Sequence, residues 1–272
     1  MGRRISFSAF HGGRVGCVRR PNMEAVMKLS IIGSGDWDTN LIILFADAPG
    51  VHRIYGSPDN SPWTEQGYVL TECLESILTE SDAVVIASVP ESRYKHISEA
   101  LDHDCHVWIE PPFCSNAKDA YDLVRKANEK GKLLFINHPF CYSSMLSSFL
   151  PFGAERDIVK QVRASYRVKA PLLKAMLKSR MIALLVYLGL PLSKFELQVA
   201  KGVSLEICLF EVEYKNGFIF QWDIAKDSES CQIEARRAFL SAIETQDHFC
   251  RTDGEHGLEV MRIMEFLADN GL

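Results

Sequence analysis

Apolar residues in the first half of the chain fall into short runs separated by amphipathic segments. Each run spans four or five residues, as the buried strands of a parallel sheet do. The strands are predicted at 29–32, 52–55, 83–87, 106–109 and 133–136. Helices are predicted between them, at 40–48, from Thr71 as N-cap to Leu78, after Pro90 with Tyr94, Ile97 and Leu101 on one face, and from Ser115 as N-cap to Gly131. Repeated strand–helix units predict a parallel sheet covered by helices on both faces.

The pattern changes in the second half, where longer and partly alternating runs predict antiparallel strands. These strands are predicted at 158–168, 195–199, 205–214 and 218–224. Asn216-Gly217 between the last two runs predicts a type I′ hairpin, which joins antiparallel strands. Helices are predicted at 172–188, at 235–243 and after Thr252, which would form a capping box with Glu255. The second half is therefore expected to be a shortened α+β domain, built on a mostly antiparallel open sheet with helices on one side.

Three aromatic residues, Phe218, Phe220 and Trp222, occupy one face of the predicted hairpin. They could pack under the helices of their own domain, or they could form a subunit interface on an uncovered sheet face. The pattern supports the two interpretations equally.

The first 26 residues form an extension that is expected to lack fixed structure. Its first 22 residues contain five arginines and no acidic residue, a composition found in organelle transit peptides. No clean amphipathic helix emerges from this stretch, however. The favoured interpretation is an upstream extension outside the fold, with the folded chain starting at Met27.

Composition narrows the range of functions. The net charge of −5 gives no reason to expect nucleic acid or an anionic membrane as a partner. The longest apolar stretch, Met181–Leu190, is too short to span a bilayer and reads as a buried helix. The eight cysteines include no Cys-x-x-Cys pair, which favours free thiols and a cytoplasmic location. No metal site is expected, because His103-Asp104-Cys105-His106 spans a helix-to-strand turn where alternate side chains diverge.

A glycine-rich motif follows the first predicted strand and opens a helix, which is where a dinucleotide fingerprint belongs. The first glycine of such a motif allows a tight turn, and the second lets the backbone approach a pyrophosphate. Asp38 replaces the third glycine, and with Asp36 it would repel the pyrophosphate by on the order of 1 kcal/mol per carboxylate. The predicted cofactor-binding residues of this loop are Gly33, Ser34, Gly35, Asp36 and Trp37.

Ser57 follows the second predicted strand, where an acidic residue usually binds the ribose hydroxyls of NAD. Without that carboxylate a 2′-phosphate is not repelled. NADP(H) is therefore slightly favoured over NAD(H), and Ser57 is predicted to lie at the cofactor.

Three further stretches occur in a recognisable order: Asp82–Pro90, Ala100-Leu101 and His106–Pro112. Together with the glycine loop and Gly254–Leu258, they resemble the glucose–fructose oxidoreductase, inositol dehydrogenase and rhizopine-catabolism (Gfo/Idh/MocA) family. The resemblance implies a Rossmann dinucleotide-binding domain at 27–139 and a substrate and oligomerisation domain at 140–272. It implies an NAD(P)-dependent oxidoreductase that acts on a sugar, polyol or related molecule between the domains and forms a homodimer through the second sheet. By the same resemblance, four more residues are predicted to contact the cofactor: Ser88, Pro90, Glu110 and Pro111.

The chain departs from this family at positions that carry chemistry. Members usually have Glu-Lys-Pro where this chain has Glu110-Pro111-Pro112, and Pro111 can neither carry charge nor donate a proton. Their Asp-x-x-x-His pair corresponds to Met176 and Arg180, neither of which is an acid–base group near neutral pH. A pseudoenzyme that keeps the fold as a binding or scaffold subunit is therefore the alternative function.

Other residues could supply the missing chemistry. His138 follows a strand end and is the first candidate for acid–base catalysis, although it could also be a polar residue at a domain hinge. Tyr142 could donate a proton or simply pack in the core. Lys178 and Arg180 could bind an anionic substrate, or they could belong to a solvated helix face.

Overall fold

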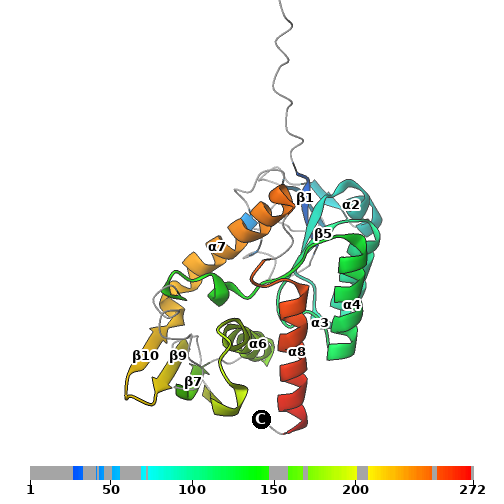
Figure 1. Ribbon diagram of the computed structural model, residues 1–272. Coiled ribbons are helices and arrows are strands. Elements are labelled where there is room, and N and C mark those ends of the chain that lie inside the picture. Colours follow the sequence, from blue (N-terminus) through cyan, green and yellow to red (C-terminus); the bar gives the residue numbers. More distant parts are fainter. Residues whose placement is uncertain are drawn as a thin grey trace, which may run out of the picture.

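Two sheets and the helices around them make up the structure, a computed structural model (Figure 1). It describes residues 27–32, 41, 43–45, 51–55, 69–71, 73–146, 159–167, 171–200, 208–246 and 250–270.

The first sheet is parallel throughout, and its strands follow the order β3-β2-β1-β4-β5-β6. They are β1 (Leu29–Ile32), β2 (Val51–Tyr55), β3 (Val69–Thr71), β4 (Ala83–Ile86), β5 (His106–Ile109) and β6 (Leu134–Ile136). This is the strand order of a doubly wound dinucleotide-binding fold. In such a fold the ligand crevice opens at the carboxyl ends of the strands beside β1, where the order reverses. The predicted α/β class is confirmed.

The first helices begin elsewhere than the sequence pattern predicts. Thr71 is the last residue of β3, so it does not cap α2 (Leu74–Glu80), which follows Cys73. The short strand β3 was not predicted, since only three residues pair with β2. In α3 (Pro90–Asp102), Ile97 is buried as predicted, whereas Tyr94 is 40% exposed. Arg93 takes its place on the buried face.

Helix α4 (Ala117–Lys130) is capped by Asn116 and not by Ser115. The side-chain oxygen of Asn116 accepts a hydrogen bond from the backbone N–H of Asp119 at 2.8 Å. Gly131 ends the helix in the left-handed conformation, with φ of 61°, as predicted.

The second sheet has the order β10-β9-β7-β8, in which only β7 and β8 are parallel neighbours. Its strands are β7 (Val159–Arg167), β8 (Phe195–Ala200), β9 (Cys208–Tyr214) and β10 (Ile219–Asp223). Two short 3₁₀ turns, η2 (Pro139–Tyr142) and η4 (Leu192–Lys194), connect neighbouring elements. The mostly antiparallel sheet of the prediction is confirmed.

The β9–β10 hairpin differs from the type I′ turn that Asn216-Gly217 predicts. Gly217 has φ of 84°, but Asn216 does not have the positive φ that a type I′ turn requires. The N–H of Gly217 donates to the carbonyl of Tyr214, and the N–H of Tyr214 donates to the carbonyl of Phe218. This is a three-residue loop, a type I turn followed by a left-handed glycine.

The aromatic side chains on one face of this hairpin become more exposed toward the turn. Trp222 is 2% exposed and its indole N–H donates to Asp227 at 2.7 Å, Phe220 is half-buried, and Phe218 is 44% exposed. The opposite face of the sheet is charged, because Arg163 lies there with Glu196, Glu211 and Glu213 within 4 Å.

Three long helices follow in the second half: α6 (Pro171–Tyr187), α7 (Ile224–Thr245) and α8 (Gly254–Asp269). Helix α6 contains the apolar stretch predicted to be a buried helix. Helix α7 begins 11 residues before the predicted start, directly after β10. Helix α8 is capped by Asp253, which accepts from the N–H of His256 at 3.0 Å, so the predicted Thr252 cap is wrong. Within the described part of the chain, no helix is long and apolar enough to cross a membrane.

Helices from the second half complete the core of the first half. Trp108 on β5 stacks on Phe135 of β6 with ring centroids 4.6 Å apart. Phe239 of α7 meets both rings at 5.5 Å, edge-on, and all three side chains are buried. Helix α8 packs beside α4 and α6 (Figure 1). One face of the first sheet is therefore covered by elements that lie far along the chain.

Candidate active site

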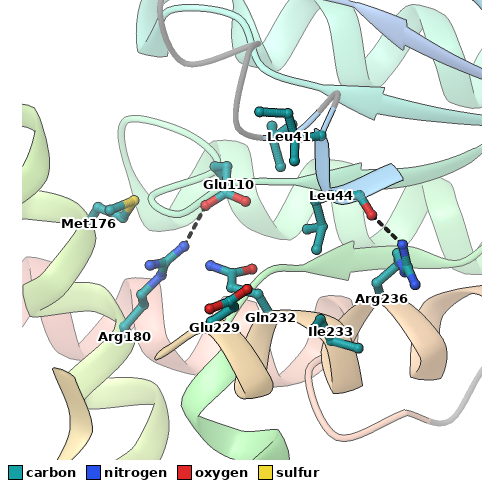
Figure 2. Close-up of a pocket in the computed structure, with 10 residues that line it drawn as sticks. Leu41, Leu44, Glu110, Met176, Arg180, Glu229, Gln232, Ile233 and Arg236 are labelled. Carbon is teal, nitrogen blue, oxygen red and sulfur yellow. Dashed lines mark hydrogen bonds and ion pairs between the residues drawn. The ribbon is translucent and has the colours of Figure 1, made fainter. Parts of the chain in front are cut away.

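A cavity of about 500 Å³ opens at the carboxyl edge of the first sheet, between that sheet and helices α6 and α7 (Figure 2). Glu110, at the end of β5, contributes the sheet side, and Met176 and Arg180 contribute the α6 side. The complete lining is Leu41, Ile43, Leu44, Glu110, Met176, Arg180, Glu229, Gln232, Ile233 and Arg236. Both halves of the chain thus build the wall of one cavity, at the edge where a doubly wound fold binds its ligand.

A buried ion pair joins the two halves at this cavity. Nη2 of Arg180 lies 2.7 Å from Oε2 of Glu110, and the two side chains are 7% and 9% exposed. Asn137, after β6, donates from its amide nitrogen to Oε1 of Glu110 at 2.5 Å and to Gln232 at 2.8 Å. Charges this deeply buried require such partners. Nε of Arg180 has no hydrogen-bond partner in the part of the chain that the structure describes.

Arg93 fixes the backbone that carries Glu110. Its Nε donates to the carbonyl of Ser88 at 3.0 Å, and its Nη1 donates to the carbonyls of Glu110 and Pro112. The ends of β4 and β5 are thus tied together by one guanidinium. Burial lowers the pKa of Arg93, and Glu110 opposes that shift.

Helix α7 presents one stripe of side chains to the cavity: Glu229, Gln232, Ile233 and Arg236. The spacing i, i+3, i+4, i+7 places these residues on one helical face. Nη1 of Arg236 donates to the backbone carbonyl of Leu44 at 2.5 Å, whereas its buried Nε has no partner among the residues that the structure describes. Gln232 lies between Arg180 and Arg236 in Figure 2.

His138 is not among the residues that line this cavity. It is 1% exposed, and its ring packs against His256 with centroids 5.6 Å apart. Burial, then the nearby His256 and Arg180, hold the pKa of His138 well below its ordinary value. Its imidazole is therefore neutral near pH 7. Its role in acid–base catalysis stays a prediction.

Tyr142 belongs to the core between the halves rather than to the cavity of Glu110. Its hydroxyl lies 3.1 Å from Oγ1 of Thr252, its ring stacks on Phe135, and burial raises its pKa. The guanidinium of Arg251 lies 5.7 Å from the ring centroid. The structure thus brings Tyr142 and Thr252 together, away from Arg180.

Only one of the two predicted substrate residues on α6 faces the cavity. Arg180 lines it, but Lys178, two residues earlier, does not. Two positions along a helix differ by about 200°, so the side chains leave from opposite faces. Burial, and then Lys174, lower the pKa of Lys178.

Several predicted cofactor residues lie outside the described part of the chain, namely Gly33, Ser34, Gly35, Asp36, Trp37 and Ser57. Of the others, Ser88 follows β4, and its buried hydroxyl has no hydrogen-bond partner within the described ranges. Pro90 is the first residue of α3, and Pro111 is buried beside Glu110. No cluster of three metal-binding side chains occurs in the ranges that the structure describes.

Sequence reasoning missed Asn137, Gln232 and Arg236 as site residues. Asn137 stands at a strand end beside His138, so its position alone could have marked it. The α7 residues show helical spacing, but that spacing is common to any helix face. Only the packing of α7 against the first sheet identifies their face as a cavity wall.

Comparison with known proteins agrees with this architecture. Residues 31–138 match the family described as "Oxidoreductase family, NAD-binding Rossmann fold" (Gfo/Idh/MocA). No curated protein sequence matches the chain.

Solved structures match nearly the whole chain at low identity. A putative oxidoreductase from Magnetospirillum magnetotacticum has a TM-score of 0.74 at 16% identity, covering 89% of this chain and 99% of its own. UDP-N-acetylglucosamine 3-dehydrogenase GnnA from Acidithiobacillus ferrooxidans has a TM-score of 0.69 at 15% identity, and the match covers 87% of this chain and 95% of GnnA. KijD10, a 3-ketoreductase from Actinomadura kijaniata in complex with NADP and TDP-benzene, has a TM-score of 0.68 at 15% identity. The match covers 87% of this chain and 95% of KijD10. At these identities the similarity concerns the fold.

Proposed function

Because the chain carries the NAD-binding Rossmann domain of the Gfo/Idh/MocA oxidoreductase family, we propose that it is an NAD(P)(H)-dependent oxidoreductase. Its substrate is a small polar molecule such as a sugar or polyol, held in the cavity between the sheet and α6 and α7. The single observation that carries the proposal is the position of that cavity, lined from both halves at the carboxyl edge of the parallel sheet. The similar structures support it, because one is a sugar-nucleotide dehydrogenase and another contains NADP.

The described residues fit a dinucleotide at this edge. Ser88 and Asn137 each follow a strand of the sheet, and the buried hydroxyl of Ser88 and amide oxygen of Asn137 have no hydrogen-bond partner among the described residues. Unpaired buried polar atoms are rare in native proteins, and ribose hydroxyls or a carboxamide would satisfy them. The absence of an acidic residue at Ser57 supports NADP(H) as the preferred form.

A nicotinamide bound at this edge would supply hydride chemistry between its ring and a carbinol or carbonyl carbon of the substrate. Glu110 is the group that we assign to the proton, because its carboxylate lines the cavity whereas His138 does not. In oxidation, the substrate hydroxyl loses its proton to Oε2 or Oε1 of Glu110 as the carbon loses hydride; in reduction the proton returns to the alkoxide. Arg180 holds the carboxylate in place through their ion pair and binds substrate oxygen.

Titration of the purified protein with NADPH and NADH, followed by nicotinamide fluorescence, tests the proposal. Saturable binding at micromolar concentrations is expected, with NADPH binding more tightly. A substrate screen should then give cofactor turnover that Glu110→Gln abolishes at a temperature where circular dichroism shows the variant to be folded. If neither dinucleotide binds, the oxidoreductase is excluded and a scaffold subunit is the remaining function.

The proposal includes a homodimer formed through the outer face of the second sheet, where Arg163 lies among three glutamates. A charged face of this kind associates in a salt-dependent manner. Light scattering after size exclusion should report a dimer at low salt and a monomer for Arg163→Glu. A wild-type monomer at all salt concentrations would rule out the dimer.

A further inference from the structure

The cavity contains an arginine whose charge has no counter-ion in the part of the chain that the structure describes. Arg236 is half-buried, and no carboxylate lies within 4 Å of its guanidinium among the described residues. Its one hydrogen bond goes to a neutral acceptor, the carbonyl of Leu44, and its Nε is buried and unpaired. Partial burial of a charge without a counter-ion is unfavourable, as is burial of an unsatisfied N–H donor.

The other cation of the cavity, Arg180, has a counter-ion. Arg180 already has the carboxylate of Glu110 at 2.7 Å, so its charge is balanced. The remaining acidic residue, Glu229, is exposed and lies seven residues before Arg236 on the same face of α7. Seven residues of helix span about 10 Å, so the two charges mark opposite ends of the stripe. The cavity therefore has one end that attracts anions and one that repels them.

From this arrangement we infer that the substrate is an acidic polyhydroxylated molecule whose carboxylate or phosphate binds Arg236, next to Gln232. This inference rests on the proposed function and narrows its substrate class. Guanidinium groups bind carboxylate and phosphate through paired N–H donors, and only one donor of Arg236, on Nη1, is used by a described residue, the carbonyl of Leu44. Figure 2 places Arg236 across Gln232 from the Glu110–Arg180 pair. The acid end of the substrate thus lies away from the group assigned to the proton.

Arg237 provides a matched control on the same helix. It follows Arg236 directly, but its side chain is 66% exposed, pairs with Glu234 at 2.5 Å and does not line this cavity. Arg236→Met and Arg237→Met remove the same charge from neighbouring positions. Arg236→Lys keeps the charge and loses the planar fork of donors.

The test compares acidic sugars with their neutral counterparts at equal concentration and constant ionic strength. The pairs are D-glucuronate with D-glucose, D-galacturonate with D-galactose, and D-glucose 6-phosphate with D-glucose. The readout is the shift in melting temperature of the full chain, with and without NADPH. We expect at least one acid to raise the melting temperature more than its neutral partner, in the wild type and in Arg237→Met. Arg236→Met should weaken binding of that acid at least tenfold, and Arg236→Lys should weaken it less.

Two results would overturn the inference. One is the absence of an acid–neutral difference in every pair; the other is a difference that survives in Arg236→Met. A third measurement separates substrate from cofactor, because a cofactor phosphate could also reach Arg236. If Arg236→Met weakens NADPH binding tenfold while the response to the acid persists, the anion belongs to the cofactor and the substrate assignment fails. Failure of the wild type to bind NADPH refutes the proposed function, whereas the sugar comparison without cofactor still decides the inference.

Discussion

The guanidinium of Arg180 on α6 lies 2.7 Å from the carboxylate of Glu110 after β5, and both side chains are more than nine-tenths buried. The pair connects the second half of the chain to the edge of the parallel sheet where β5 ends. The pair lies next to Pro111, at the position where members of the Gfo/Idh/MocA family usually have a lysine. A buried positive charge is therefore present at this site, but it comes from Arg180 on α6 and not from position 111.

Removing one member of this pair should strongly destabilise the fold. Arg180→Met leaves a buried carboxylate without its counter-ion, so we expect a loss of about 3–5 kcal/mol in the free energy of unfolding. Urea denaturation followed by Trp fluorescence measures it. In a double-mutant cycle, Glu110→Gln with Arg180→Met should cost less than the sum of the single variants. Additive losses would show that the two side chains act independently.

Acid should destabilise the protein through His138. Its folded-state pKa lies well below the ordinary 6.5, because burial disfavours the imidazolium and His256 and Arg180 add to that effect. The unfolded chain therefore binds more protons below pH 6.5, so stability is fully present above that pH and is lost as the pH falls further. Unfolding free energies at about pH 7.5 and pH 5.5 should differ less in His138→Gln than in the wild type. His103→Gln, in an exposed turn, should keep the wild-type difference.

The start of α4 should depend on Asn116 rather than on its neighbour. Asn116→Ala removes the acceptor for the N–H of Asp119 and should lower the unfolding free energy by about 1 kcal/mol. Ser115→Ala should change it by less than about 0.5 kcal/mol, since Ser115 is exposed and is not the cap. Chemical denaturation of both variants side by side checks the assignment, which equal effects would contradict.

Two glycines of α8 should respond differently to alanine. A Cβ at Gly257 would lie 2.7 Å and 2.8 Å from side-chain atoms of Ile136, which is fully buried in β6. Overpacking of this kind costs about 1–3 kcal/mol. A Cβ at Gly254 would meet Val124 at 3.1 Å, so Gly254→Ala should be milder. Thermal unfolding ranks the two variants, and a larger effect at Gly254 would mean that α8 does not pack against β6 as described.

The first half of the fold follows from local patterns, because buried parallel strands read as apolar runs between helices. Leu29–Ile32 and Ala83–Ile86 are found where these patterns place them. The missed strand, Val69–Thr71, has three residues and no such run. The cap errors have one cause: several residues near a helix start can accept a hydrogen bond, and sequence alone does not show which backbone geometry forms. Asn116 and Asp253 were each one residue beyond the predicted cap.

The candidate site was less predictable than the fold. Arg180 and Glu110 were named from the sequence, but for separate roles, because the 70 residues between them hide their contact. Arg236 lies still further along the chain, and nothing near it indicates a ligand. Tyr142 was weighed as a proton donor, and only the packing around it shows Thr252 at its hydroxyl. Contacts of this range depend on how α6 and α7 dock, which no local pattern encodes.

Because Phe239 of α7 fills the space beside Trp108 and Phe135, the first half of the chain is not self-sufficient. A fragment that ends at residue 139 would leave those two rings facing water, although it contains the whole parallel sheet. Excision of the nucleotide-binding half should therefore yield an aggregating product, and the intact chain should unfold in one cooperative step. Substitutions in α7 that are meant to change the cavity can therefore also change the stability of the sheet, because α7 lines the cavity and packs against the sheet.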